Sequence, residues 1–337
     1  MPTRRNRKIV LVRRPTGMPD ASCFRLEEQD VQAPASGEVL IEVHRLSIDP
    51  FIRTSINAES YHLSVPIGGT VTALGVGRVL ESAFPDLKPG DPVFGPLGVQ
   101  AIAKLPGGFL RKLDEKLAPM DAYLGVLGLT AGLTSYFGVR NVGQVKAGEI
   151  FVVSAAAGAV GSLAGQIAKL EGARVIGIAG GAAKVRHLIE DLGFAAAIDY
   201  KGEDVAERLR ALAPDGVDVF FDNVGGEILD VVLDQIRTGA RVVICGAISQ
   251  YQNMEHVRGP SLYLRLAERH ARMEGFAVTH FAAHFAEAEA ALARWLADGK
   301  ITLHEHVEHG LERFPETLVK LFDGSHTGKL LLEVAAA

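Results

Sequence analysis

The sequence predicts a two-part α/β protein, in which a β-rich unit of barrel type is joined to a doubly wound parallel sheet. Three observations predict this fold class. The first 125 residues hold short apolar runs that are closed by turns rich in Gly and Pro. From residue 150 onward, apolar strands alternate with helical segments. A glycine-containing turn stands between the first of those strands and the helix after it.

The β-rich part contains apolar runs at residues 9–12, 38–43 and 75–80, and a turn at residues 88–92 precedes another short run. Short strands separated by such turns favour a small barrel over a layered α/β sheet. The chain begins with a short basic stretch (Arg4, Arg5, Arg7 and Lys8). We expect this stretch to be a frayed end and not a binding arm.

The second part alternates regularly. Strands are expected at residues 150–154, 174–178, 197–200, 217–221 and 241–245. Helices are expected at residues 162–170, 183–191 and 204–213, and between the last two strands. This alternation is typical of βαβ units and therefore of a parallel sheet. A long helix at residues 281–298 and a final strand at residues 329–334 complete the prediction.

The first turn of the second part has the pattern of a dinucleotide-binding turn. The strand at residues 150–154 leads directly into Ala156-x-Gly158-x-x-Gly161, which begins a helix. Such a turn points backbone N–H groups at an anion at the helix N-terminus. Gly158 would let the backbone approach a pyrophosphate, and Gly161 would let the helix lie close to the strand. A purely structural turn is the less favoured alternative.

The end of the second strand of this part favours NADPH over NADH. An acidic residue that binds the ribose is expected about 20 residues beyond the turn. Instead, Ile178 is followed by Ala-Gly-Gly-Ala-Ala and then Lys184. Without a carboxylate, a 2′-phosphate meets no repulsion, and Lys184 can pair with it. An ordinary solvated lysine is the alternative for Lys184.

Composition excludes several classes. The chain has 337 residues, enough for about two domains, and its net charge of −5 argues against a nucleic-acid surface built on bulk charge. Two cysteines do not form a disulfide framework, and no apolar run approaches the length of a membrane span. No early apolar run resembles a signal peptide. We therefore expect a cytoplasmic protein with no membrane or nucleic-acid partner.

We expect no metal site. Cys23 and Cys245 have no partners at ligand spacing, and Cys245 is expected to pack on a strand and not to act as a nucleophile. The cluster of His304, His306 and His309 is interpreted as a solvated polar stretch, although His304 and His306 would share one face of a strand. Zinc-assisted alcohol oxidation is therefore disfavoured.

Five motifs in order resemble one known family. They lie at residues 47–53, 155–162, 221–226, 244–251 and 272–276. Together they resemble the leukotriene B4 dehydrogenase/prostaglandin reductase group of the medium-chain dehydrogenase/reductase superfamily, which includes plant double-bond reductases and bacterial curcumin-type reductases. The resemblance covers nearly the whole chain. It implies a GroES-like catalytic domain (1–125 and 303–337), a Rossmann domain for NADPH (126–302) and a homodimer.

The resemblance also implies an activity and site residues. The implied activity is reduction of the C=C bond of an α,β-unsaturated ketone or aldehyde by NADPH. The implied cofactor contacts are Ala156, Gly158, Ala159, Val160, Gly161, Lys184, Tyr200, Asn223, Cys245, Gly246, Ala247, Ile248, Ser249, Phe276, Ala277 and Val278. The chain departs from the family pattern at His326, where Asn is common, and at Phe51, a candidate substrate contact where Tyr is common.

Tyr251 is the candidate catalytic residue and a second substrate contact. It follows the strand that ends at Cys245, so it lies at the carboxyl edge of the sheet, where ligands bind. Its hydroxyl would donate to the carbonyl oxygen on which charge develops, and either Tyr251 or water would protonate the α-carbon. A pocket wall or a dimer contact is the alternative role. Asp49 and Arg53 are expected to form an internal ion pair.

Two other functions stay open on the sequence. One is an NADPH-dependent quinone reductase, which also works without zinc. The other is an NADPH-binding structural or sensor protein with no biological turnover, of the kind found among the lens crystallins of the superfamily. Consumption of NADPH with an enone, with a quinone or with neither separates the three.

Overall fold

The structure is a computed structural model that describes residues 4–58 and 64–334. The chain divides into two compact units, Met1–Leu124 with Glu305–Ala337, and Gly125–His304. No helix among the described residues is long and apolar enough to cross a membrane.

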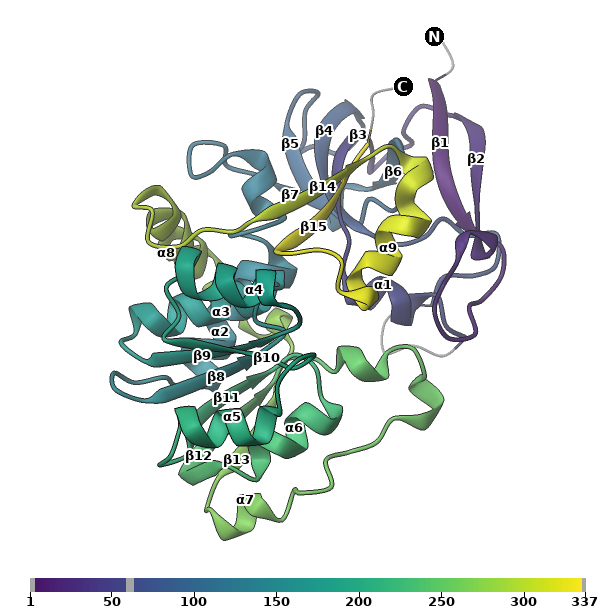
Figure 1. Ribbon diagram of the computed structural model, residues 1–337. Coiled ribbons are helices and arrows are strands. Elements are labelled where there is room, and N and C mark those ends of the chain that lie inside the picture. The colour runs from purple at the N-terminus through teal and green to yellow at the C-terminus, as the bar shows by residue number, and fades with distance from the viewer. Residues whose placement is uncertain (1–3, 59–63, 335–337) are drawn as a thin grey trace. The chain divides into compact units, whose positions relative to one another are not determined.

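The first unit is built on a seven-stranded sheet and a two-stranded ribbon (Figure 1). The sheet has the order β14-β15-β3-β4-β5-β7, and β6 also pairs with β3. The strands are β1 (Arg4–Leu11), β2 (Phe24–Val31), β3 (Glu38–Ser47), β4 (Leu74–Ser82), β5 (Pro92–Gly95), β6 (Ile102–Pro106), β7 (Arg111–Lys112), β14 (Glu305–His309) and β15 (Lys329–Glu333). The helices are α1 (Pro50–Ser55), α9 (Phe314–Asp323) and single 3-10 turns at Ala21–Cys23, Gly107–Phe109, Met120–Tyr123 and Leu311–Arg313.

The basic N-terminal stretch is a strand. β1 pairs with β2 in antiparallel register along all eight of its residues. Basic residues of β1 face acidic residues of β2, as in the pair Lys8 and Glu27, and Arg5 forms an ion pair with Glu28 at 2.9 Å. The expectation of a frayed end is therefore wrong, because complementary charges and a full ladder of hydrogen bonds order these residues.

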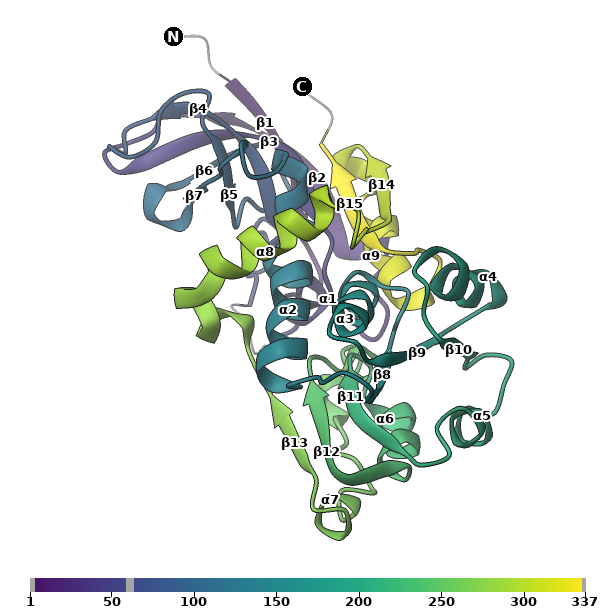
Figure 2. The same cartoon turned by 90° about the vertical axis from the view of Figure 1, so that its left-hand side faces the viewer.

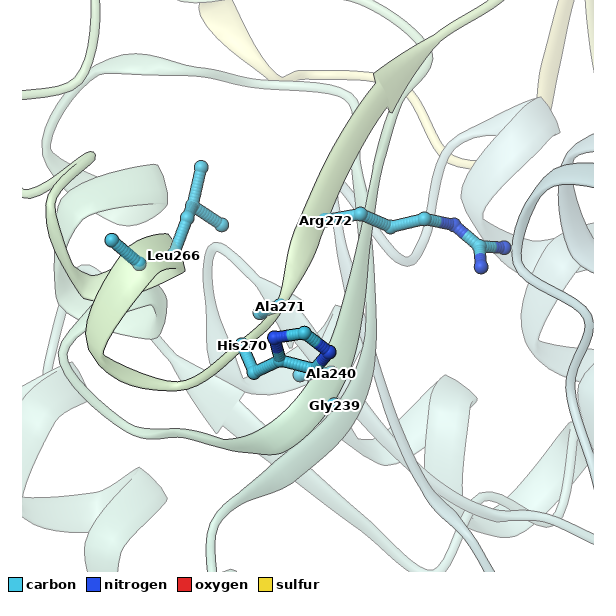
Figure 3. Close-up of a pocket in the computed structure, with 7 residues that line it drawn as sticks. Gly239, Ala240, Leu266, His270, Ala271 and Arg272 are labelled. Atoms are coloured by element: carbon cyan, nitrogen blue, oxygen red, sulfur yellow. The ribbon is translucent and has the colours of Figure 1, made fainter.

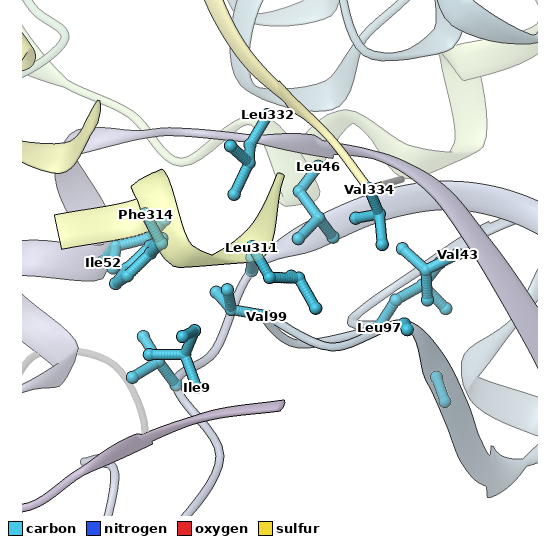
Figure 4. Close-up of a cluster of buried hydrophobic side chains, with 14 of the residues drawn as sticks. Ile9, Val43, Leu46, Ile52, Leu97, Val99, Leu311, Phe314, Leu332 and Val334 are labelled. Carbon is cyan, nitrogen blue, oxygen red and sulfur yellow. The ribbon is translucent and has the colours of Figure 1, made fainter. Parts of the chain in front are cut away.

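The core of the first unit joins segments from both ends of the chain (Figure 4). β15 lies between β14 and β3, parallel to the first and antiparallel to the second. Leu332 on β15 and Phe314 on α9 are buried in the same cluster as Ile9 and Leu46. The C-terminal segment thus completes the apolar core that the N-terminal strands begin.

A buried ion pair links β15 to the start of α1. The Lys329 ammonium donates to the Asp49 carboxylate at 2.6 Å, and both residues are almost fully buried. The Ser47 hydroxyl also donates to that carboxylate. Arg53 instead donates to the Gly17 carbonyl at 2.8 Å. The expected pair of Asp49 with Arg53 is therefore wrong, because a lysine 280 residues away in sequence reaches the carboxylate.

The second unit is a six-stranded, wholly parallel sheet with the order β10-β9-β8-β11-β12-β13. Its strands are β8 (Ile150–Ser154), β9 (Arg174–Ala179), β10 (Ala196–Asp199), β11 (Val217–Asp222), β12 (Ile236–Ile244) and β13 (Arg272–Gly275). The strand order reverses between β8 and β11, and ligands bind at such a switch point in open α/β sheets. The fold class predicted from the sequence is confirmed.

Helices cover both faces of this sheet (Figures 1 and 2). α2 (Thr134–Phe137), α3 (Ala159–Leu170) and α4 (Ala182–Arg186) lie on one face, and α5 (Val205–Leu212) and α6 (Gly226–Leu233) lie on the other. α7 (Arg265–Glu268), α8 (Phe285–Ala297) and 3-10 turns at Ile248–Gln250, Met254–His256 and Val278–His284 complete the unit. π-helical turns at Leu129–Leu133, Gly138–Val142 and His187–Asp191 extend α2 and α4.

Candidate active site

The turn after β8 presents the N-terminus of α3. Ala155 has a φ of +48°, a left-handed conformation that is rare for a residue with a side chain. The Gly158 amide donates to the Ala155 carbonyl at 2.9 Å, and α3 begins at the next residue without a side-chain cap. The first amides of α3 therefore have no capping side chain and can bind an anion.

The two glycines of this turn are required for different reasons. A Cβ at Gly161 would lie 2.3 Å from the Ala155 carbonyl oxygen and 2.8 Å from the Ala156 Cα, so the closeness of helix and strand explains this glycine. A Cβ at Gly158 would meet the protein no closer than 3.3 Å. Internal contacts therefore demand glycine less strictly at position 158 than at position 161. The space in front of Gly158 is what a pyrophosphate would need for close approach, and in this respect the turn fits a dinucleotide.

The ends of β8 and β11 are joined through buried polar groups. The Ser154 hydroxyl donates to the Asp222 carboxylate at 2.8 Å and accepts the Asn223 backbone N–H at 2.8 Å. The Asn223 side-chain amide donates to the Ser154 carbonyl, also at 2.8 Å. The backbone amides of Val224 and Gly225 donate to the same carboxylate at 3.0 to 3.1 Å. Asp222 is therefore the centre of the loop after β11.

The loop after β12 is fixed to the same centre. The amides of Cys245 and Gly246 donate to the Asp222 carbonyl at 2.9 and 3.2 Å. The Ile248 amide donates to the Asn223 carbonyl at 3.1 Å. Further along, the Ser249 hydroxyl donates to the Val224 carbonyl at 2.6 Å. The loops after β8, β11 and β12 consequently form one hydrogen-bonded unit at the carboxyl edge of the sheet.

Tyr251 closes the loop after β12. Its hydroxyl oxygen accepts the Ala247 backbone N–H at 3.0 Å. A Cβ at Gly246 would lie 3.1 Å from that oxygen, so glycine leaves room for the phenol. In the contact with Ala247 the phenol is the acceptor, and this contact does not use the hydroxyl proton.

Burial controls the two ionisable groups of this centre. Asp222 is fully buried, and burial raises the pKa of its carboxyl although the donors from Val224, Ser154 and Gly225 oppose the shift. Burial, together with the charge of Asp222, raises the pKa of the Cys245 thiol to about 12. Cys245 is thus a protonated thiol at neutral pH, which makes it a poor nucleophile.

The loop after β9 lies beside the loop after β10, which carries exposed polar groups. Tyr200 is 47% exposed, and its ring and the Lys201 stem lie over Gly180, where a Cβ would be 2.8 and 3.0 Å from them. Lys184 is half-buried on α4 in the same loop region. The Asp199 carboxylate accepts the Gly181 N–H at 2.7 Å. An acidic side chain therefore reaches this loop from the neighbouring strand.

The other candidate residues lie outside the loops after β8 to β12, some in the second unit and some in the first. Phe276 is half-buried and packs edge-on against Phe281, with ring centroids 6.3 Å apart, and Ala277 precedes the 3-10 turn that begins at Val278. Phe51 lies on α1 of the first unit and packs against the apolar core there. The His326 ring bonds to the Lys320 carbonyl at 2.7 Å, which ties it to α9.

A separate hollow of about 510 Å³ lies at the opposite edge of the parallel sheet (Figure 3). It is lined by small and apolar residues around His270, next to the start of β13. The Arg272 side chain points away from it and donates to the Val142 carbonyl at 2.8 Å. One imidazole among small side chains gives this hollow little chemistry. Tyr251 and the glycine turn do not line it.

No group of three or more His, Cys, Asp or Glu residues among those described could hold a metal ion. His304 precedes β14, and the imidazoles of His306 and His309 bond to Glu308 and Glu333 at 2.9 and 3.3 Å. His304 lies outside β14, so the strand does not place His304 and His306 on one face.

Sequence reasoning missed Ser154 and Asp199. Both are the last residues of parallel strands, β8 and β10. A polar residue at the end of a buried strand is itself a signal, because the carboxyl ends of all parallel strands meet at one edge. Which neighbouring loop each side chain reaches depends on strand order, and the sequence does not specify that order.

Comparison with known proteins identifies the family. Residues 7–113 match the N-terminal domain of oxidoreductases, and residues 159–296 match the zinc-binding dehydrogenase family. The NADPH-dependent curcumin reductase of Escherichia coli is 40% identical over 98% of this chain and 97% of its own. The NADP(+)-dependent 2-alkenal reductase of Nicotiana tabacum is 36% identical over 98% of each chain. The crystal structure of CurA in complex with NADPH from Vibrio vulnificus has a TM-score of 0.91 at 38% identity, over 97% of this chain and 99% of that one.

These relatives span the whole chain at well above 30% identity, and both units are matched. The fold agrees with that of the solved relative, at a TM-score of 0.91. The chain belongs to the medium-chain dehydrogenase/reductase superfamily, in the zinc-independent group that contains curcumin, 2-alkenal and prostaglandin reductases.

Proposed function

We propose that this protein is an NADPH-dependent reductase of the C=C bond of α,β-unsaturated ketones or aldehydes. One observation carries the proposal. The loops after β8, β11 and β12 form a single hydrogen-bonded unit, which holds the Tyr251 hydroxyl beside the backbone N–H of Ala247. Relatives named as NADPH-dependent reductases of curcumin and of 2-alkenals support the same substrate class.

The proposed mechanism depends on what Tyr251 does at the substrate carbonyl. When bound, NADPH supplies a hydride for the β-carbon of the substrate. Negative charge then develops on the carbonyl oxygen, and the Tyr251 hydroxyl donates a hydrogen bond to it. The Ala247 N–H holds the phenol oxygen in place, so the donor is oriented before charge develops. Tyr251 or water then protonates the α-carbon.

The residues that would hold NADPH fall into two groups. The pyrophosphate would bind the turn and the first amides of α3, Ala156, Gly158, Ala159, Val160 and Gly161, and the adenosine end would meet Lys184 and Tyr200. The nicotinamide end would meet Asn223, Cys245, Gly246, Ala247, Ile248, Ser249, Phe276, Ala277 and Val278. Tyr251 and Phe51 would contact the substrate. Asp222 would order the loop that presents Asn223.

We also propose a homodimer in the cytoplasm. β13 is an edge strand, and all four of its residues are exposed, with Met273 36% exposed. An open edge offers unpaired N–H and C=O groups to a second copy. Met273→Pro should therefore convert the dimer to a monomer in sedimentation velocity, and a monomeric wild-type protein at micromolar concentration would disprove the dimer.

Two free cysteines favour a reducing compartment.

The decisive experiment measures NADPH consumption at 340 nm with enones and enals of differing chain length and with a matched series of quinones. The proposal expects turnover with the enones and identification of the saturated ketone by mass spectrometry. Turnover with quinones alone would establish a quinone reductase instead. Tight NADPH binding with no turnover on any substrate would favour a structural or sensor role.

A further inference from the structure

The strand that neighbours β9 supplies a carboxylate that the sequence pattern does not reveal. The residues that directly follow β9 contain no acid, which favours a 2′-phosphate at this position. β10 pairs with β9 in parallel, and Asp199 stands opposite Ala179 at the carboxyl end of both strands. Asp199 therefore lies at the loop where the adenosine ribose is expected.

Backbone amides hold Asp199 at this loop. One of its oxygens accepts the Gly181 N–H at 2.7 Å and the Lys201 N–H at 3.0 Å. These hydrogen bonds, led by that of Gly181, lower the pKa of the carboxyl, so it carries a full negative charge at neutral pH. The charge repels a phosphate but not a hydroxyl.

A second lysine lies on the loop after β10, which is next to the loop after β9. Lys201 is exposed, and its stem lies over Gly180, 3.0 Å from the position a Cβ would take there. The ring of Tyr200 lies beside it at 2.8 Å from that position. Glycine at position 180 thus lets Tyr200 and Lys201 lie directly over the end of β9. Lys184 lies in the first turn of α4, and its backbone N–H donates to the Gly181 carbonyl at 3.0 Å.

We propose that the preference of this protein for NADPH over NADH is set by Lys184 and Lys201 acting against the charge of Asp199. This inference rests on the proposed NADPH site and adds Lys201 and Asp199 as residues that determine cofactor specificity. Lys184 and Lys201 attract the 2′-phosphate, and Asp199 weakens that attraction while it orders the loop through Gly181. The protein therefore binds NADPH less tightly than its lysines alone would allow.

The test measures dissociation constants by calorimetry for NADPH, NADH, adenosine 2′,5′-bisphosphate and AMP. Asp199→Asn keeps an oxygen for the amides of Gly181 and Lys201 and removes the charge. It should tighten NADPH and adenosine 2′,5′-bisphosphate about three- to tenfold and leave NADH and AMP unchanged. Lys201→Met should weaken the first two ligands by a similar factor. Both effects should shrink at high salt, because Lys201 is exposed and Asp199 is only half-buried.

Asp204→Asn is the matched control. Asp204 follows on the same loop and caps α5 through the Glu207 N–H at 3.0 Å, and Asn keeps that acceptor. This variant should change each affinity less than twofold. An Asp199→Asn protein of unchanged melting temperature that binds NADPH no tighter, or loses NADH, overturns the inference. A wild-type protein that fails to bind NADPH would instead overturn the proposed function.

Discussion

The two ends of the candidate cofactor site are built in different ways. The loops after β8, β11 and β12 are joined by hydrogen bonds between backbone groups and the buried side chains of Ser154 and Asp222. The loop after β9 is held by the carboxylate of Asp199, and the neighbouring loop after β10 carries the exposed Tyr200 and Lys201. Buried hydrogen bonds fix the positions of the loops at the first end. At the second end, charged side chains are accessible to solvent and to a ligand.

The difference predicts two kinds of response to substitution. Loss of a buried hydrogen bond leaves a polar group unsatisfied, so variants at the first end should lose stability and cofactor affinity together. Exposed charges contribute little to stability and are screened by salt, so variants at the second end should change affinity alone. The following variants test that division, beginning with the largest expected effect.

Gly161→Ala should have the largest effect. The new Cβ would lie 2.3 Å from the Ala155 carbonyl oxygen, and a backbone atom cannot move aside as a side chain can. We expect NADPH affinity to fall more than about a hundredfold and stability to fall by about 1–3 kcal/mol. Calorimetry and thermal melting measure the two losses.

Gly158→Ala is the control for this turn. Its Cβ would approach the Ala155 carbonyl no closer than 3.3 Å, so the protein should fold with a melting temperature near that of the wild type. NADPH affinity should nevertheless fall, because the methyl group occupies the path of the pyrophosphate. Equal effects of both substitutions on stability would contradict the distinct roles of the two glycines.

Tyr251→Phe removes the proposed donor. We expect kcat for enone reduction to fall about a hundredfold, which is the usual cost of losing one donor at a developing oxyanion. The dissociation constant of NADPH should change less than about threefold, because the ring still fills the loop. Stopped-flow hydride transfer and fluorescence titration separate the two quantities. Full turnover in this variant would exclude a role for the hydroxyl.

Ser154→Ala should disturb the centre that joins the loops. The substitution removes the donor to Asp222 and the acceptor of the Asn223 N–H. We expect a loss of about 1–3 kcal/mol in stability and about tenfold in NADPH affinity, both insensitive to salt. Ser162→Ala is the control, because that buried hydroxyl makes only a 3.3 Å contact with its own helix at Ala159. A salt-dependent loss in Ser154→Ala would contradict a geometric role.

Periodicity in the sequence predicted the second unit well, because each strand of a parallel sheet buried on both faces is a continuous apolar run. The strand at 150–154 agrees with β8 at both ends, and Ala159 begins α3 only three residues before the expected start. β13 was not predicted as a strand, because all its residues are exposed and its sequence, Arg-Met-Glu-Gly, has no apolar pattern. Tertiary pairing with β12 makes it a strand.

Contacts that join distant segments were beyond the sequence. The pair of Asp49 with Lys329 spans 280 residues, and Arg53 was the nearer and wrong choice. Asp199 acts on a loop 18 residues earlier because β10 pairs with β9 in parallel, which no local pattern specifies. The local pattern thus predicted the turn between β8 and α3, whereas the partners that orient the loops depend on strand order.

Substitution of Glu308 should have the smallest effect on NADPH affinity. It tests whether a charge of the first unit influences cofactor binding. Glu308 lies on β14 of the first unit, and hydrogen bonds from Lys320 and His306 lower the pKa of its carboxyl to about 2, from 4.5. A lowered pKa means that its contribution to stability is present above pH 4.5 and is lost as pH falls towards 2. Glu308→Gln should therefore cost roughly 1 kcal/mol at pH 7 and nothing at the acid limit. NADPH affinity at pH 7 should stay within twofold of the wild type, and a larger change would show that a charge of the first unit also affects cofactor binding.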